Sequence, residues 1–508
     1  MDLLPFTQDG QGRLLNMGRL HFILDIWHQK RRREDEEKDS DNYLLSRYKK
    51  TITANRDSPS SNSRPSNYIR NQASDTAILD GRYDPRNSTP TAAPPVQLYH
   101  PVFADFLGTM DDTSDLPEDL VVETGSLMRS ASGIAVLESS RSLPSRTHLS
   151  NILGFPLVQS VNLDKTSAAH TMLHSRTSPP VQTALLAIVE EKSELGPGGD
   201  VTTQGGCSYT AFWLSRDHRE LRECSCCPSF IICLTGPWMV VMGAVFTTQP
   251  IVQRLTDFVW LGTSPIISDV QCIRVSGILR ALKAGIRSLD NYYRDLEHLP
   301  LLSNAHHPRF FPFPTFYNVD QSQVHFKYLE PLKPLDPDCI TFLAETILDK
   351  TKVVVKFAQT YGVEAHRLLA QHDLAPPLLY FKHLNEDGVG YGALKMVVMG
   401  YVEGMTASKV FNGAALSPNV VVGLERALNI LHGKGLVFGD LRRPNIMIMP
   451  EDNTVQLIDF DWAGKENEAR YPIHLNESKE VKWADGVGSY RKIDKKHDLD
   501  MLRRLRTP

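Results

Sequence analysis

The sequence predicts a multidomain protein of mixed α/β structure, because of its length, its ordinary globular composition and its alternating strand-like and helix-like stretches. A chain of 508 residues can hold two or three domains. Its 41% apolar and 22% charged residues are typical of globular proteins. Composition divides it into a mostly disordered N-terminal region (1–95), an α/β domain (96–298), a linker (299–320) and a C-terminal α/β domain (321–508).

The N-terminal region has the composition of a disordered segment. Residues 28–95 are poor in apolar side chains and rich in Ser, Asn, Asp, Arg and Pro. Lys30–Arg33 is either a nuclear localisation patch or, with the acidic residues 34–37, part of a solvated helix. The odd count of seven cysteines and the lack of a signal-peptide pattern at Met1–Leu4 favour an intracellular location, cytoplasmic or nuclear. The net charge of −4 argues against a generally basic nucleic-acid binder.

One apolar run raises the question of a membrane span. Phe230–Phe246 is almost wholly apolar but shorter than the roughly 20 residues that a spanning helix needs. The dipeptide at 236–237 is Gly-Pro, which breaks helices and forms turns. We therefore predict two strands, Ser229–Thr235 and Trp238–Thr247, and no membrane association.

The middle domain carries a candidate metal site at the end of a strand. The apolar strand Thr183–Val189 runs into Glu190, and Lys192 lies two positions further on the same strand face. A carboxylate beside a lysine can hold a divalent metal while the lysine helps to activate water. With Gln204 on the following helical stretch, the pattern resembles the Glu-x-Lys strand of the restriction-endonuclease-like (PD-D/ExK) superfamily.

This resemblance implies an endonuclease-like fold in which a second metal-binding carboxylate precedes the strand. The stretch Ser167–Thr183 contains no Asp or Glu, and Asp164 is the nearest acidic residue. A strand that merely ends in surface charges gives the same pattern. We therefore predict the fold with little or no cleavage of nucleic acid, and nucleic acid stays only a weakly supported partner.

The most specific motif lies near the C-terminus. Asp440 follows the helix-like run Val421–Gly433 and a short strand, and Asn445 lies five positions later. A second apolar strand ends at Asp459. In phosphoryl transfer an Asp of this kind orients the attacking hydroxyl and accepts its proton, while an Asn and a second Asp hold Mg²⁺.

Three upstream stretches supply the rest of a nucleotide site. Lys356 lies in the β-branched strand Val353–Phe357, and Glu364 opens a helical stretch eight positions later. Met396–Gly404 reads as a strand followed by a hinge. Together these segments resemble the protein kinase superfamily, in which the Lys contacts the α- and β-phosphates, the Glu pairs with the Lys and the hinge binds adenine.

The resemblance covers roughly Gln321–Leu505 and has clear departures from the family pattern. No glycine-rich loop precedes Lys356, and Asp461 stands where Asp-Phe-Gly has its glycine. About 50 residues follow Asp459, without an Ala-Pro-Glu segment, and His497–Leu499 is either an anchor for the catalytic loop or a helix cap. The domain is most similar to divergent kinase-like modules of basidiomycete fungi.

The resemblances imply a two-lobed kinase-like domain that uses ATP and Mg²⁺. Asp440 and Lys356 are the expected catalytic residues, Lys356, Glu364, Asn445 and Asp459 bind the cofactor, and Asn445 and Asp459 hold the metal. The expected activity is phosphoryl transfer to a protein Ser or Thr. A pseudokinase that binds a nucleotide or partner is the first alternative. A metal-dependent nuclease regulated by the kinase domain, as in proteins resembling Crinkler-type effectors, is the second.

Overall fold

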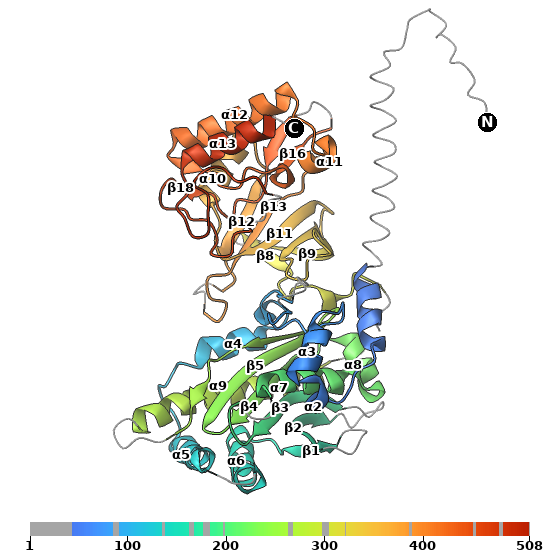
Figure 1. The fold of residues 1–508 in the computed structure, drawn as a ribbon, viewed down its shortest axis with the longest axis vertical. Coiled ribbons are helices and arrows are strands. Elements are labelled where there is room, and N and C mark those ends of the chain that lie inside the picture. The colour runs from blue at the N-terminus through green and yellow to red at the C-terminus, as the bar shows by residue number, and fades with distance from the viewer. Residues whose placement is uncertain are drawn as a thin grey trace, which may run out of the picture.

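The computed structural model describes residues 43–84, 91–134, 138–161, 167–175, 183–196, 199–262, 268–296, 304–320, 322–385, 389–450, 454–476 and 481–506. Within these ranges the protein is a mixed α/β structure with two large sheets (Figure 1). The first sheet lies between helices, whereas the second leads into a mostly helical C-terminal body. No described helix has the length and apolarity needed to cross a membrane.

The first sheet has seven strands in the order β1-β2-β3-β4-β5-β6, with β7 paired to β5. All neighbours are antiparallel except β3 and β4, which are parallel. Parallel neighbours need a crossover connection, and α7 (Val201–Leu214) supplies it. The strands are β1 Val158–Val161, β2 Ser167–Ser175, β3 Thr183–Lys192, β4 Ser229–Thr235, β5 Trp238–Phe246, β6 Pro250–Arg254 and β7 Val259–Trp260.

Helices cover both faces of this sheet. Successive strand residues point to opposite faces, and accordingly Ile231 packs against Gly205 of α7 while Phe230 packs against Gly285 of α9. The sheet is therefore the middle of three layers. The other elements of this part are η1 Val96–Leu98, α4 Pro101–Thr109, α5 Glu118–Ser132, α6 Glu138–Leu153, η2 Arg216–His218, α8 Arg219–Cys224 and α9 Ser268–Arg294.

The apolar run Phe230–Phe246 forms two strands, as predicted from its Gly-Pro turn. β4 and β5 pair along their whole length and meet at Thr235 and Trp238. Gly236 in the turn has a φ of +54°, in the left-handed region that glycine adopts without strain. The predicted strand boundaries are confirmed to within one residue.

The prediction of disorder across residues 28–95 is wrong for the described residues 43–84. Residues 43–53, α2 (Pro59–Asn62) and α3 (Pro65–Gln72) are helical, and α2 packs on α7. Tyr48 is 1% exposed and accepts a hydrogen bond of 3.1 Å from Arg222. Tyr48 and Tyr68 are buried in the core shared with the neighbouring sheet, and a composition argument does not consider such contacts. Lys30–Arg33 lies outside the described residues.

The expected linker packs closely against the rest of the protein where the structure describes it. Arg309, the middle residue of the short helix η3 (Pro308–Phe310), is 3% exposed. Its guanidinium donates to the backbone carbonyls of Arg222, Phe246 and Thr247. It also lies 4.3 Å from the ring centre of Tyr48. Residues 304–314 are therefore part of the folded structure rather than a free connection.

The second sheet has six antiparallel strands in the order β12-β13-β11-β10-β9-β8. They are β8 Phe316–Val319, β9 Ser322–Pro331, β10 Thr341–Thr346, β11 Lys352–Ala358, β12 Leu378–His383 and β13 Lys395–Gly400. The remaining elements are α10 Val363–Ala370, β14 Met405–Thr406, α11 Ala407–Phe411, α12 Pro418–Gly433, β15 Leu436–Val437, η4 Arg443–Asn445, β16 Ile446–Ile448, β17 Val455–Leu457, β18 Gly464–Lys465 and α13 Lys495–Arg506.

The two large sheets share one hydrophobic core. A single cluster of buried side chains runs from the first sheet to the second, and the helical C-terminal body has a separate cluster. Phe311 lies at the junction, where its ring stacks on Tyr328 of β9 at 5.5 Å with an interplanar angle of 6°. The second sheet is therefore packed against the N-terminal part on one side and against the helical body on the other (Figure 1).

Candidate active site

Lys356 lies on β11 in the interior of the second sheet, between β13 and β10. Its side chain is buried, and its Nζ atom lies 2.6 Å from Oδ1 of Asp459 and 2.7 Å from Oδ1 of Asp461. A buried ammonium group requires paired charges to be stable. The structure thus brings together Lys356 and Asp459, two residues predicted from the sequence, and adds Asp461.

The two carboxylates sit on either side of Phe460 in the turn after β17. Asp459 has a φ of +68°, a conformation that Asp tolerates better than most residues, and Phe460 is fully buried. Burial raises the pKa of Asp461 to about 6, and the charge of Asp459 adds to this effect against the opposing charge of Lys356. For Asp459, burial is outweighed by Lys356 and then Lys333, so its pKa lies below the usual value. Asp459 is therefore the more firmly ionised of the two.

Asp440 and Asn445 form the second half of the site. Asp440 is 5% exposed, and its Oδ2 atom accepts hydrogen bonds from Arg442 at 2.6 Å and from Asn445 at 2.7 Å. The Nε of Arg442 donates to Oδ1 of the same carboxylate. Burial raises the pKa of Asp440 despite these bonds, and the charge of Asp459 acts in the same direction.

A backbone contact joins this loop to the turn that carries Asp459. The amide of Ile458 donates to the carbonyl of Asn445 at 3.0 Å. The antiparallel pairing of β16 with β17 holds the two segments side by side. The predicted pair Asn445 and Asp459 therefore belongs to one site.

Arg442 is a site residue that the sequence interpretation missed. Its guanidinium binds both carboxylate oxygens of Asp440 and lies 4.9 Å from the ring centre of Trp483 and 5.6 Å from that of Trp462. Cation–π contacts of this kind hold a guanidinium in place. Its position two residues after Asp440 in the motif was the available signal.

Asp498 anchors the start of the loop that carries Asp440, which favours one of the two interpretations of His497–Leu499. Its carboxylate is 1% exposed and accepts hydrogen bonds from the backbone amides of Phe438 at 2.9 Å and Gly439 at 2.8 Å. His432 contacts the same carboxylate at 3.1 Å. Asp498 lies inside α13, in its first turn, so it acts as an anchor and not as the helix cap.

Glu364 does not pair with Lys356 in the structure, although the resemblance implies that pair. It lies on an exposed side of α10 and lines a surface pocket with Lys434 and Lys465. The reason is the short connection from β11 to α10. It turns the opposite face of the helix inward, where His366 stacks on Phe460 at 4.5 Å.

The expected hinge lies where β13 ends. β13 forms the strand predicted at Met396–Gly404, and residues 401–404 then lead to β14 in the helical body. The amide of Tyr401 donates to the carbonyl of Lys352, and the amide of Gly404 donates to that of Val402. The segment thus connects the second sheet to the body that carries Asp440.

The second predicted site, in the first sheet, is occupied by internal hydrogen bonds. Glu190 is 3% exposed and accepts from Gln204 at 2.9 Å through Oε2 and from Ser208 through Oε1. Lys192 lies at the end of the same strand, and Asp164 lies outside the described residues. In the parts of the chain that the structure describes, no group of three or more His, Cys, Asp or Glu side chains is arranged to hold a metal.

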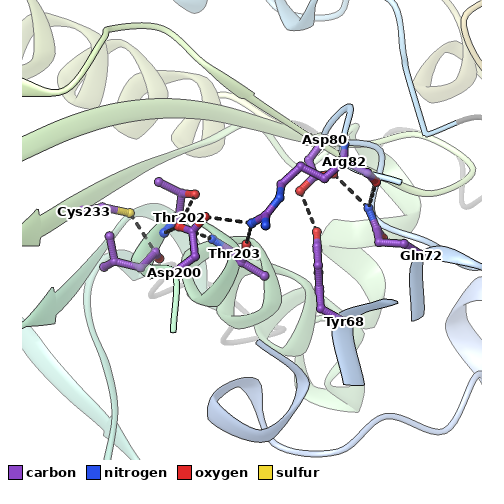
Figure 2. Close-up of polar contacts among 9 residues, drawn as sticks. Tyr68, Gln72, Asp80, Arg82, Asp200, Thr202, Thr203 and Cys233 are labelled. Carbon is purple, nitrogen blue, oxygen red and sulfur yellow. Dashed lines mark hydrogen bonds and ion pairs between the residues drawn. The ribbon is translucent and has the colours of Figure 1, made fainter. Parts of the chain in front are cut away.

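The segment before residue 84 covers the start of α7 beside this site (Figure 2). Asp200 caps α7 by accepting hydrogen bonds from the amides of Thr202 and Thr203. Arg82 donates to Asp200 at 2.7 Å and to the hydroxyl of Thr203 at 2.6 Å. Tyr68 donates to Asp80 at 2.6 Å, which fixes the chain that carries Arg82. The charged side chains of Arg82, Asp80 and Asp200 are therefore used in contacts within the protein.

Comparisons with known proteins give distant structural similarity and no match in sequence. No protein-family model matches the chain, and no curated protein matches it in sequence. The chain is similar to the structure of the kinase PK-1 of Cydia pomonella granulovirus, at 13% identity and a TM-score of 0.26. The match covers 35% of this chain and spans about 65% of the viral kinase. A similarity this distant does not assign an activity.

Proposed function

We propose that the C-terminal part of the chain is an ATP-dependent phosphotransferase with a protein kinase-like fold. One observation carries the proposal: Lys356 binds Asp459, 103 residues away in sequence, beside the linked pair Asp440 and Asn445. These are the residue types that phosphoryl transfer needs for phosphate contact, metal binding and hydroxyl activation. The strand and helix order around them matches the order that the resemblance implies.

The donor atoms fit a Mg²⁺-nucleotide. Mg²⁺ prefers oxygen ligands, and Asp459 offers a carboxylate. Asn445 donates its amide N–H groups to Asp440, which leaves its amide oxygen for a metal. Lys356 would exchange its carboxylate partners for the α- and β-phosphates, and the bound Mg²⁺ would supply charge neutralisation of the phosphates.

Asp440 is the residue that we assign to the acceptor hydroxyl. Its raised pKa makes it a better proton acceptor than an exposed carboxylate. Oδ2 of Asp440 accepts from both Arg442 and Asn445, whereas Oδ1 accepts only from Arg442, so Oδ1 keeps a lone pair for the proton of a hydroxyl. We assign the hydroxyl to a protein Ser or Thr, as the sequence resemblance implies.

A pseudokinase is the second candidate, and the same contacts favour it in a different way. Both Lys356 and Asp440 are held by partners within the chain. If these contacts persist when a nucleotide is present, Lys356 does not reach the phosphates. The protein would then bind a partner without transferring phosphate. The nuclease alternative has less support, because both oxygens of Glu190 are hydrogen-bonded and Asp164, the nearest acidic residue before the strand, lies outside the described residues.

A thermal-shift titration of the full chain tests nucleotide binding. A ligand that binds only the folded state stabilises it by about 2.7 kcal/mol at 100 times its Kd. We expect Mg²⁺-ATP to raise the melting temperature and Asp459→Asn to reduce that rise. An unchanged melting temperature at millimolar Mg²⁺-ATP would contradict the proposal.

A second measurement separates enzyme from pseudokinase. Asp440→Asn should abolish transfer of the γ-phosphate to the protein itself or to peptides, yet spare the thermal shift, because Asp440 faces the hydroxyl and not the phosphates. A wild-type protein that shows the shift but transfers no phosphate would favour the pseudokinase.

A further inference from the structure

The loop that joins β9 to β10 is built from two consecutive proline turns. The amide of Asp336 donates to the carbonyl of Lys333 at 3.1 Å, and the amide of Cys339 donates to that of Asp336 at 3.0 Å. Pro334 and Pro337 occupy the second position of the two turns, where the fixed φ of proline fits. The loop of residues 332–340 is therefore stiff and contains no glycine.

Such a loop cannot bind phosphate as a glycine-rich loop does. Backbone cradles for phosphate need several free N–H groups that point toward the anion. Pro334 and Pro337 have no N–H, and the amides of Asp336 and Cys339 are used within the turns. The loop therefore has no run of free backbone amides, and a side chain is the better source of a phosphate contact from it.

Strand register places Lys333 at the same end of the sheet as Lys356. Lys356 pairs with Thr341 of β10, and the carbonyl of Thr341 accepts from the amide of Leu332 at 2.9 Å. Lys333 is the next residue. Its side chain is exposed and forms no ion pair with a described residue, and it lies close enough for its positive charge to act on the carboxylates of both Asp459 and Asp461.

The site has too few positive charges to bind a polyphosphate without a further cation such as Lys333. Asp440 is balanced by Arg442, but Lys356 alone faces the two carboxylates Asp459 and Asp461. A polyphosphate would add further negative charge to this cluster. One Mg²⁺ and Lys356 would have to neutralise all of it without another cation.

We propose that Lys333 is a phosphate-binding residue that replaces the backbone cradle of a glycine-rich loop with a single side-chain cation. The proposal rests on the proposed nucleotide-binding function. It assigns the ligand contact to the polyphosphate and not to the nucleoside. The two proline turns hold the backbone from which Lys333 reaches the phosphates.

The test compares Mg²⁺-ATP with adenosine by isothermal titration of the full chain. Lys333→Ala should weaken Mg²⁺-ATP binding by about tenfold, the size expected of one charge-assisted hydrogen bond. Adenosine affinity should stay unchanged, and Lys333→Arg should keep most of the ATP affinity. Lys350→Ala is the matched control, because Lys350 is an exposed lysine in the turn at the opposite end of β10.

The outcomes separate this proposal from the proposed function. Wild-type binding of Mg²⁺-ATP with no change in Lys333→Ala overturns the role of Lys333 and leaves nucleotide binding intact. An equal loss of ATP and adenosine affinity in Lys333→Ala also overturns it, since a phosphate contact cannot act on adenosine. A wild-type chain that binds neither ligand overturns both proposals.

Discussion

Replacing Asp498 tests whether a single buried carboxylate holds the loop that carries Asp440. In Asp498→Ala the backbone amides of Phe438 and Gly439 lose their acceptor at a position where Asp498 is only 1% exposed. Each buried donor left without a partner costs about 1–3 kcal/mol. The two amides together predict a loss of about 2–6 kcal/mol in the free energy of unfolding. Asp498→Asn keeps one carbonyl oxygen and should lose less.

Guanidinium unfolding followed by tryptophan fluorescence measures this loss. Two of the six tryptophans, Trp462 and Trp483, lie beside Arg442, so part of the signal reports on the region around the loop. Asp500→Ala is the matched control on the same helix, where the half-buried carboxylate pairs with Arg504 and accepts one backbone hydrogen bond from Asp485. Such a pair contributes at most about 1 kcal/mol. Equal unfolding midpoints for Asp498→Ala and Asp500→Ala would refute the anchoring role.

Three further predictions follow from buried polar groups. Burial lowers the pKa of His366 from 6.5 to about 4, so its contribution to stability is complete above pH 6.5 and is lost as the pH falls toward 4. The free energy of unfolding should therefore fall less steeply over that range in His366→Gln than in the wild type, and equal slopes would contradict this. Arg309→Met leaves three backbone carbonyls without their donor and should destabilise the chain by about 3 kcal/mol in denaturant unfolding; a change within 0.5 kcal/mol, of the order of a surface substitution, would show that the buried guanidinium is dispensable. Mg²⁺ or Mn²⁺ should produce little plasmid nicking, because Glu190 is already hydrogen-bonded; robust nicking that Glu190→Ala and Lys192→Ala both remove would establish a nuclease.

Local patterns in the sequence predicted the elements that depend on local chemistry. The Gly-Pro turn located β4 and β5 to within one residue. The β-branched run around Lys356 became β11, and the apolar run before Asp459 became β17. Each of these assignments needed only strand propensity and a turn signal, which neighbouring residues carry.

The same local patterns did not predict contacts between segments that are distant in sequence. Residues 43–84 have few apolar side chains, but several of these are buried in a core that they share with a sheet formed later in the chain. Glu364 has the expected residue type and position, yet the short connection before α10 turns it outward. In both cases the burial of a side chain depends on which other part of the protein its segment packs against. The hydrophobic periodicity of a single sequence does not reveal that partner.

The shared core of the two sheets restricts how the proposed nucleotide site can move. A Cβ atom on Gly390, in the connection between β12 and β13, would lie 2.0 Å from the carbonyl oxygen of Ala104 in α4, so the two backbones are in direct contact there. Phe311 joins the same parts by stacking on Tyr328. A packed interface of this kind resists deformation, because native interiors are close-packed and have low compressibility. The second sheet, which carries Lys356, is therefore fixed to the N-terminal part. Any opening of the nucleotide site would have to come from the helical body with its separate core, which moves Asp440 and Asp459 away from Lys356.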